Sequence, residues 1–146
     1  MVTAHAHGAG DTPPGWITAL LELPGIGFLA RLCLASPFIG SGFGKLLDFS
    51  GAVTEAGALG LRPAALVAGA VILVQLGGSA LFLTRRWCWL GAGLLAGFTV
   101  AATLIAHPFW RFEGHDRVRQ VATFLEHLAI VGGFAAASLL VHRRAR

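Results

Sequence analysis

Four long apolar segments constrain this chain more than any other feature. They run from about residues 26 to 47, 64 to 83, 90 to 106 and 121 to 141. Each has roughly the 20 residues that a helix needs to cross about 30 Å of hydrocarbon. Charged residues make up only 12% of the chain, against about 25% in soluble domains, and the mean hydropathy is +0.73. The pattern predicts an all-α integral membrane four-helix bundle, built as one domain from residue 26 to residue 142.

The residues before the first span have a different character. Residues 1–16 are small or polar and show no periodicity, which predicts a disordered tail. Trp16 begins a short mixed stretch that suits the membrane interface, and Pro24 with Gly25 marks a break before the first span. No Lys or Arg precedes Arg31, so the basic start of a secretory signal is missing. We therefore expect the first 25 residues to form a tail and an interfacial segment, and the first apolar segment to be retained.

Four spans bring both chain ends and the turn at Arg85 and Arg86 to one side of the membrane. Lys and Arg residues near the spans are equal in number on the two sides. Those on the side of the termini adjoin the helix ends in short segments, which favours termini in the cytoplasm. The net charge is +4, but the basic residues form no continuous patch, so a nucleic-acid partner is not expected.

Two polar residues inside the spans need shelter, because a charge at the bilayer centre costs roughly 2.5–3.5 kcal/mol. Arg31 stands about a turn and a half into the first span, so its side chain can snorkel to the interface. Gln75 lies near the middle of the second span, where its amide needs a partner. The candidate partners are Ser36, Ser41 and a backbone carbonyl freed by a kink at Pro37. We interpret Gln75 as a contact between helices.

Small residues predict where helices approach one another closely. The faces expected to make such contacts are Gly40, Gly42 and Gly44 in the first span, and Gly93 with Gly97 in the third. Between the spans, residues 48–63 have the composition of a partly helical surface loop. Residues 113–120 are polar enough that we expect them to lie in water.

A cluster of five polar residues is predicted at the side opposite the termini. Its members are Lys45, Asp48, His107, Glu126 and His127. Lys45 and Asp48 are spaced i, i+3 and can pair on one helix face. The cluster suits the headgroup of a quinone or another small molecule, which needs donors and a proton source, or else an ion-pair network that only anchors the bundle. No metal is predicted, because a short ligand motif such as HExxH is absent.

Four segments of the chain resemble, in order and spacing, the DoxX family of small four-helix prokaryotic membrane proteins. The segments are RLCLASPFIGSGFGKLLDF, VQLGGSALFL, AHPFW and FLEHLAIVGGF. The family positions that the resemblance implies are Arg31, Lys45, Asp48, Gln75 and His107. Many members have a carboxylate in place of Gln75 and a Lys-Asn pair in place of Glu126 and His127, so the chain departs from the family pattern there.

The resemblance also implies a function. One branch of the family is associated with a thiosulfate:quinone oxidoreductase, and another with a membrane complex for oxidative stress and thiol balance. The expected role is a subunit or partner of a quinone- or thiol-linked redox system in a bacterial cytoplasmic membrane. Because the sequence has no flavin, haem or iron–sulfur motif, we expect quinone binding or anchoring, with other redox subunits or further copies of the chain as partners in the lipid bilayer. A transporter or an assembly protein without redox chemistry is the alternative.

Overall fold

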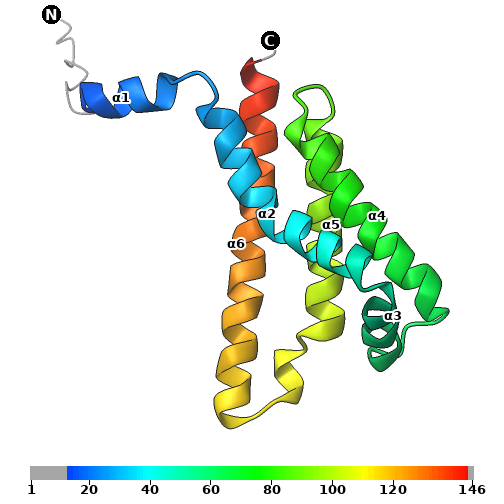
Figure 1. Ribbon diagram of the computed structural model, residues 1–146. Helices are drawn as coiled ribbons and strands as arrows, with labels where there is room; N and C mark the ends of the chain where they lie inside the picture. Colours follow the sequence, from blue (N-terminus) through cyan, green and yellow to red (C-terminus); the bar gives the residue numbers. More distant parts are fainter. Residues whose placement is uncertain (1–12, 145–146) are drawn as a thin grey trace, which may run out of the picture.

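The computed structural model describes residues 13–144, which contain helices and no strands (Figure 1). The elements in order are α1 (Gly15–Glu22), α2 (Ile26–Leu47), α3 (Phe49–Ala58), α4 (Ala64–Leu83), α5 (Cys88–Ala106), the 3-10 helix η1 (Phe109–Arg111) and α6 (Gly114–Arg144). This confirms the predicted all-α membrane fold. The tail predicted to be disordered falls mostly on residues 1–12, outside the described residues.

Four of these helices, α2, α4, α5 and α6, are long and apolar enough to cross a membrane. α2 and α4 have the bounds expected from the apolar segments, and α5 begins slightly early, at Cys88. α6 differs most, because it begins at Gly114 and includes residues expected in a polar connection. Its 31 residues give a length of about 46 Å, against about 30 Å of hydrocarbon. The polar first turns can therefore be helical and still project into water.

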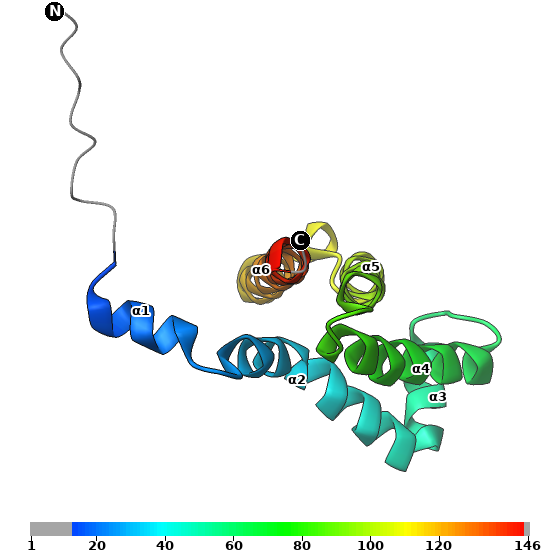
Figure 2. The same cartoon turned by 90° about the horizontal axis from the view of Figure 1, so that it is seen from above.

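The short helix α1 runs at a steep angle to α6 and extends away from the bundle (Figures 1 and 2). None of its residues is buried, and Trp16, Leu20 and Leu21 are exposed. The chain turns into α2 at Gly25, whose φ of 94° lies in the left-handed region that favours glycine. An exposed helix carrying Trp and Leu side chains is suited to the membrane interface.

The helix α2 changes direction about midway, near Pro37 (Figures 1 and 2). Proline cannot donate the backbone hydrogen bond of that turn, which explains the bend. The first half of α2 lies beside α6, whereas the second half leaves α6 and runs toward α3. The bend therefore separates α2 from α6 at the end of the bundle that carries α3.

The apolar core holds the other end of the bundle together. The ring of Phe134, on α6, packs against Phe82 of α4 and Phe38 of α2, with ring centroids 4.9 Å and 5.5 Å apart. The remaining buried members of the core are Ala35, Cys88, Ala92 and Leu95. Because Phe82 and Cys88 flank the α4–α5 turn, this core fixes the helices at the end where the chain termini lie.

Glycines set two close approaches between helices. A Cβ atom at Gly91 of α5 would lie 2.6 Å from the carbonyl oxygen of Gly78 on α4 and would overlap the backbone of Phe82. Similarly, a Cβ atom at Gly42 of α2 would lie 2.7 Å from Cδ2 of Leu76. The contact predicted for Gly42 is therefore confirmed.

The other glycines expected at helix contacts do not contact a neighbouring helix in the described chain. A Cβ atom at Gly40, Gly44, Gly93 or Gly97 would have no neighbouring atom within 4 Å in the described chain. For these four positions the prediction of a contact within the chain was wrong, because they point away from the neighbouring helices.

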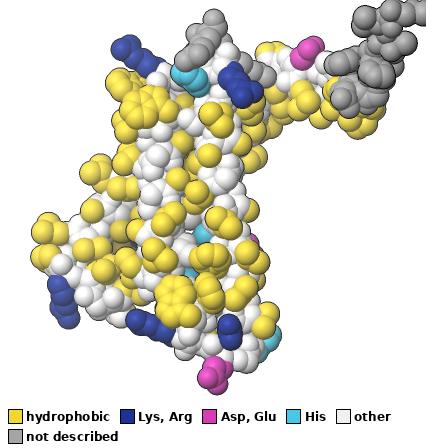
Figure 3. All heavy atoms as spheres, turned by 180° about the vertical axis from the view of Figure 1, so that it is seen from behind, with side chains coloured by type: hydrophobic (Ala, Val, Ile, Leu, Met, Phe, Trp, Pro, Cys, Tyr) yellow, Lys and Arg dark blue, Asp and Glu magenta, His cyan; other side chains and the backbone are white. Residues whose placement is uncertain are grey.

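Charged side chains lie at the two ends of the molecule, with an apolar band between them (Figure 3). This distribution fits a bundle that crosses a bilayer. The segment expected to be a partly helical loop contains α3, which packs on the side of α4 and buries Ala52 and Ala56. The helix α3 thus adds a wall beside the second half of α2.

Candidate functional site

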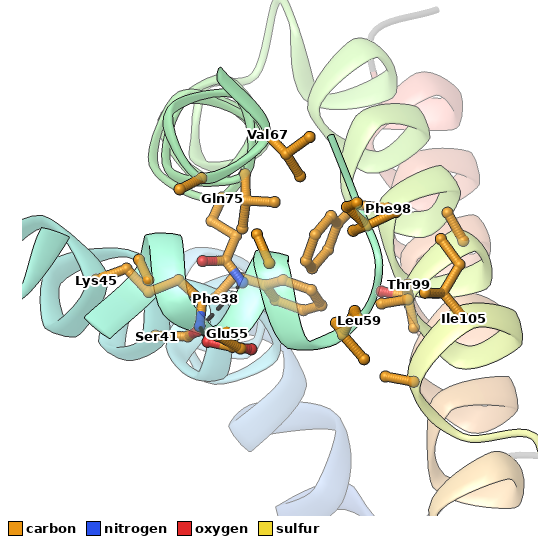
Figure 4. Close-up of a pocket in the computed structure, with 18 of the residues that line it drawn as sticks. Phe38, Ser41, Lys45, Glu55, Leu59, Val67, Gln75, Phe98, Thr99 and Ile105 are labelled. Carbon is orange, nitrogen blue, oxygen red and sulfur yellow. Dashed lines mark hydrogen bonds and ion pairs between the residues drawn. The ribbon is translucent and has the colours of Figure 1, made fainter. Parts of the chain in front are cut away.

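A cavity of about 540 Å³ lies where α2 diverges from α6, and its walls come from α2, α3, α4, α5 and α6 (Figure 4). Most of its surface is apolar, with Phe38 and Phe98 among the lining residues. The polar residues that line it are Ser41, Lys45, Glu55, Gln75, Thr99, His107 and His127. Three members of the predicted cluster, Lys45, His107 and His127, therefore share this cavity with the intramembrane Gln75.

The side chain of Gln75 contributes a buried polar atom that has no partner. Only 4% of the residue is exposed, and its Nε2 donates to the hydroxyl oxygen of Ser41 at 3.2 Å. Ser41 was one of the partners predicted from the sequence; Ser36 instead donates to the carbonyl of Cys33. Within residues 13–144, Oε1 of Gln75 is the one fully buried side-chain nitrogen or oxygen atom without a hydrogen-bond partner. A buried acceptor without a donor is costly, by about 1–3 kcal/mol.

The rings of His107 and His127 form an edge-to-face pair with centroids 5.3 Å apart. The hydroxyl of Thr103 donates to the carbonyl of Thr99 at 2.6 Å, so it must accept from Nδ1 of His127, 2.7 Å away. Nδ1 of His107 lies 2.8 Å from Oε1 of Gln120, an amide oxygen that can only accept. Each neutral ring therefore carries its proton on Nδ1 and keeps Nε2 as an acceptor.

The side chain of Lys45 forms an ion pair with Glu55 of α3. The pairing of Lys45 with Asp48 expected from their spacing is therefore wrong. Sequence reasoning missed Glu55 because it predicted a partly helical surface loop at residues 48–63 without the fold-back that brings Glu55 of α3 to Lys45 of α2. The helical run from Phe49 was the signal that could have found it.

The side chain of Asp48 has a local role at the start of α3. Its Oδ1 accepts from the backbone N–H of Gly51 and from the hydroxyl of Ser50, each at 2.9 Å. These hydrogen bonds, the backbone one first, hold the pKa of the Asp48 carboxyl below its ordinary value. Asp48 is exposed and does not line the cavity, and the same is true of Glu126.

The cap on α3 leads to a testable prediction for Asp48. Asp48→Ala is expected to speed amide hydrogen exchange across Phe49–Ala58, whereas Asp48→Asn should preserve the cap because Asn accepts equally well. A carboxylate with a depressed folded-state pKa stabilises above its unfolded pKa and loses this effect as the pH falls through the folded value. Exchange in the unchanged protein, corrected for intrinsic rates, should therefore accelerate as the pH falls below the ordinary pKa of 3.8 and through the lower folded value, and Asp48→Asn should not show that step. Equal exchange in Asp48→Ala and the unchanged protein would rule out the cap.

The guanidinium of Arg31 lies far from the cavity, at the end of the bundle that carries the α4–α5 turn. Only 7% of the residue is exposed. Its Nε donates to the carbonyl of Gly27 at 3.1 Å, and one terminal nitrogen donates to the carbonyls of Phe82 and Thr84 at 3.3 Å and 3.2 Å. The snorkelling expected for Arg31 is therefore wrong, because the end of α4 satisfies the side chain inside the protein.

The polar groups of the cavity can both accept and donate hydrogen bonds. Oε1 of Gln75 and Nε2 of each histidine are acceptors, while the ammonium of Lys45 has three donors and uses one of them on Glu55. Among residues 13–144, no group of three His, Cys, Asp or Glu residues is placed to hold a metal ion. The geometry suits an apolar molecule that carries hydroxyl groups.

Comparison with known families gives one result. The family model described as DoxX matches residues 26–108, which comprise α2 to α5. The match includes Gln75 and His107 and ends before α6, so His127 lies outside it. No curated protein and no solved structure matches the chain.

Proposed function

The chain belongs to the DoxX family, and from this premise we propose that it binds a membrane quinone, most tightly in the reduced quinol form, as a subunit or partner of a membrane redox system. The observation that carries the proposal is a buried polar residue on the wall of an apolar cavity, Gln75, whose Oε1 has no hydrogen-bond partner in the described chain. The binding site is the cavity beside Gln75, between the second half of α2 and α5–α6.

The size and lining of the cavity fit a substituted aromatic ring. Its volume of about 540 Å³ falls in the range of roughly 300–1,000 Å³ of small-molecule sites. Phe38 and Phe98 lie near each other, with ring centroids 6.2 Å apart, and both face the cavity (Figure 4). Such walls suit a flat, apolar ring and exclude water around its polar substituents.

The polar groups of the cavity match a quinol better than a quinone. A quinol carries two hydroxyl groups on opposite sides of its ring, and on oxidation it gives up two electrons and two protons to redox partners. Gln75, on the wall formed by α2 and α4, would accept one hydroxyl at Oε1 when its side chain turns toward the ring. His127 and His107, on the wall formed by α5 and α6, each present Nε2 to a second hydroxyl. A carbonyl oxygen at either place would face an acceptor and bind less well.

The histidine pair also gives the site a place for a proton. A proton accepted at Nε2 of His127 would leave the ring charged, with its Nδ1–H still held by Thr103. His107 adjoins that ring and bonds to Gln120, in the polar first turns of α6. The pair therefore leads from the cavity toward the aqueous end of the bundle. The electrons must go to a redox-active partner subunit, because the sequence has no motif for a flavin, haem or iron–sulfur cluster.

The proposal includes the setting of the protein. We assign it to a bacterial cytoplasmic membrane with α1 and the end of α6 on the cytoplasmic side. Arg85, Arg86 and Arg143 adjoin helix ends on that side in short segments, as the positive-inside rule requires. The cavity then lies toward the opposite face.

A binding titration tests the proposal. Purified protein in lipid nanodiscs is titrated with a short-chain quinol and with the corresponding quinone, and we expect saturable binding with the quinol tighter. Gln75→Leu should weaken quinol binding about tenfold, because one buried hydrogen bond of about 1.4 kcal/mol is lost. Gln75→Glu keeps an acceptor and should retain most of the affinity.

A pair of serine variants serves as the matched control. Ser41→Ala removes the group that orients the Gln75 amide, so it should weaken quinol binding. Ser36→Ala makes the same chemical change outside the cavity and should have no effect. The proposal is wrong if the unchanged protein shows no saturable binding, or if Gln75→Leu binds quinol as well as the unchanged protein does.

A further inference from the structure

A second cavity lies at the opposite end of the bundle from the quinol site and has a different character. Its volume is about 640 Å³, and it lies between the first half of α2 and the last turns of α6. Two arginines and one glutamate are its charged lining residues, namely Arg31, Arg85 and Glu22. The remaining walls are apolar or made of small residues, so the cavity combines a net positive charge with an apolar surface.

The guanidinium of Arg31 is only partly used by the protein. Its three hydrogen bonds go to backbone carbonyls, and none goes to a carboxylate within residues 13–144. The second terminal nitrogen makes no protein hydrogen bond in that part of the chain. That nitrogen is not sealed off, because Oε1 of Gln75 is the one fully buried unpaired side-chain atom there. Two N–H groups of a buried cation are thus free to face the cavity.

Only 7% of Arg31 is exposed, so solvent screens its charge weakly. The electrostatic attraction between Arg31 and a bound anion is therefore stronger than at an exposed arginine. Guanidinium N–H groups form strong, charge-assisted hydrogen bonds to phosphate oxygens, and the two free N–H groups on the second terminal nitrogen of Arg31 can each donate one. Arg85, from the α4–α5 turn, adds a second positive charge to the same cavity.

The apolar walls indicate what the phosphate is attached to. Leu34, Leu140 and Val141 line the cavity beside a strip of small residues on α6, Gly133, Ala136 and Ala137. Small residues leave a shallow groove along the helix, and the neighbouring leucine and valine side chains suit an acyl chain. The phosphate-binding end lies next to α1, at the level where lipid headgroups meet the bundle.

We propose that this cavity binds one anionic phospholipid, with its phosphate on Arg31 and Arg85 and one acyl chain along Gly133, Ala136 and Ala137. The charge of the cavity favours an anionic headgroup over a zwitterionic one. A zwitterionic headgroup would add a third positive charge beside the two arginines. This site is independent of the quinol site, because the two cavities share no lining residue.

Native mass spectrometry of the full chain in detergent tests the proposal by counting bound lipids. The protein is titrated with phosphatidylglycerol and with phosphatidylcholine of the same acyl chains. We expect one phosphatidylglycerol to bind saturably and to be preferred over phosphatidylcholine. Arg85→Gln should weaken this binding about fivefold, whereas Arg86→Gln, the same change on a residue outside the cavity, should not. Arg85 is chosen because Arg31 also holds the end of α4.

A second pair of variants tests the groove without changing any charge. Ala136→Phe fills the cavity, while Ala135→Phe adds the same ring to an exposed neighbour outside it. The first should abolish the single saturable lipid, and the second should leave it. Equal losses in Arg85→Gln and Arg86→Gln would show only general headgroup attraction and overturn the proposal. Full displacement of the lipid by millimolar inorganic phosphate would also overturn it, since free phosphate would then be the ligand.

Discussion

Replacement of Gly91 by alanine is expected to lower the thermal stability of the bundle by roughly 10 °C. The added Cβ atom would lie 2.6 Å from the carbonyl oxygen of Gly78 and would overlap the backbone of Phe82. Backbone atoms cannot rotate away as a side chain can, so α4 and α5 must move apart. Overpacking of this kind costs about 3 kcal/mol, and each kcal/mol shifts the midpoint by about 3 °C in a chain of this size. Tryptophan fluorescence during heating in nanodiscs measures the effect.

The matched control is Gly93→Ala on the same helix. Nothing lies within 4 Å of a Cβ atom at Gly93, so this change should leave the stability unchanged or raise it slightly, since alanine favours the helix more than glycine does. Gly97→Ala should behave like Gly93→Ala for the same reason. Equal behaviour of Gly91→Ala and Gly93→Ala would contradict the close approach of α4 and α5.

The glycines of α5 show what a spacing pattern leaves undecided. Gly93 and Gly97 have the small-xxx-small spacing, yet the buried stripe of α5 passes through Cys88, Gly91 and Leu95. Residues two apart on a helix point about 200° apart, so Gly91 and Gly93 lie on nearly opposite faces. Hydropathy fixes which residues cross the membrane, but it does not fix the rotation of each helix about its axis when all faces are apolar. The regular recurrence of Cys88, Gly91, Leu95 and Thr99 at helical spacing was the better signal.

The undetermined rotation of each helix about its axis also explains which parts of the candidate site could be predicted. The depth of Lys45, His107 and His127 followed from their distances to the ends of the spans, and the structure places all three on one cavity. Asp48 and Glu126 have similar depths but different directions, and they lie outside it. The depth of a residue in the membrane can be counted along the sequence, whereas the direction of its side chain depends on tertiary packing.

Two partners depended on structure that no local pattern revealed. Ser41 was one of three candidate partners for Gln75, and the structure shows that hydrogen bond. Glu55 was missed, because its pairing with Lys45 requires α3 to fold back against the end of α2. Two of the three partners of Arg31 were missed because they are backbone carbonyls more than fifty residues away. Backbone groups at helix ends have no signature in the side-chain sequence.

The role of Arg31 at the end of α4 leads to a second prediction of a large loss of stability. The last carbonyls of a helix have no partner within the helix and carry the negative end of its dipole. The guanidinium of Arg31 donates to two of them, at Phe82 and Thr84, and so joins α2 to α4. This contact and the approach at Gly91 hold α2, α4 and α5 together at one end, while the cavity beside Gln75 lies at the other end, where α2 diverges from α6.

Arg31→Met is therefore expected to destabilise the bundle by about 3 kcal/mol, because hydrogen bonds from a charged donor contribute about 1.5–3 kcal/mol and the two carbonyls are left without it. Arg31→Lys should recover part of this loss, since an ammonium group keeps the charge but not the forked geometry. Arg86→Met, on an exposed neighbour of the same turn, should have little effect. In Arg31→Met, the rate of amide hydrogen exchange across residues 82–88 should rise while the rest of the protein is still folded. The reason is that Arg31 no longer holds the carbonyls at the end of α4. If the turn stays as protected as in the unchanged protein, Arg31 does not hold the end of α4.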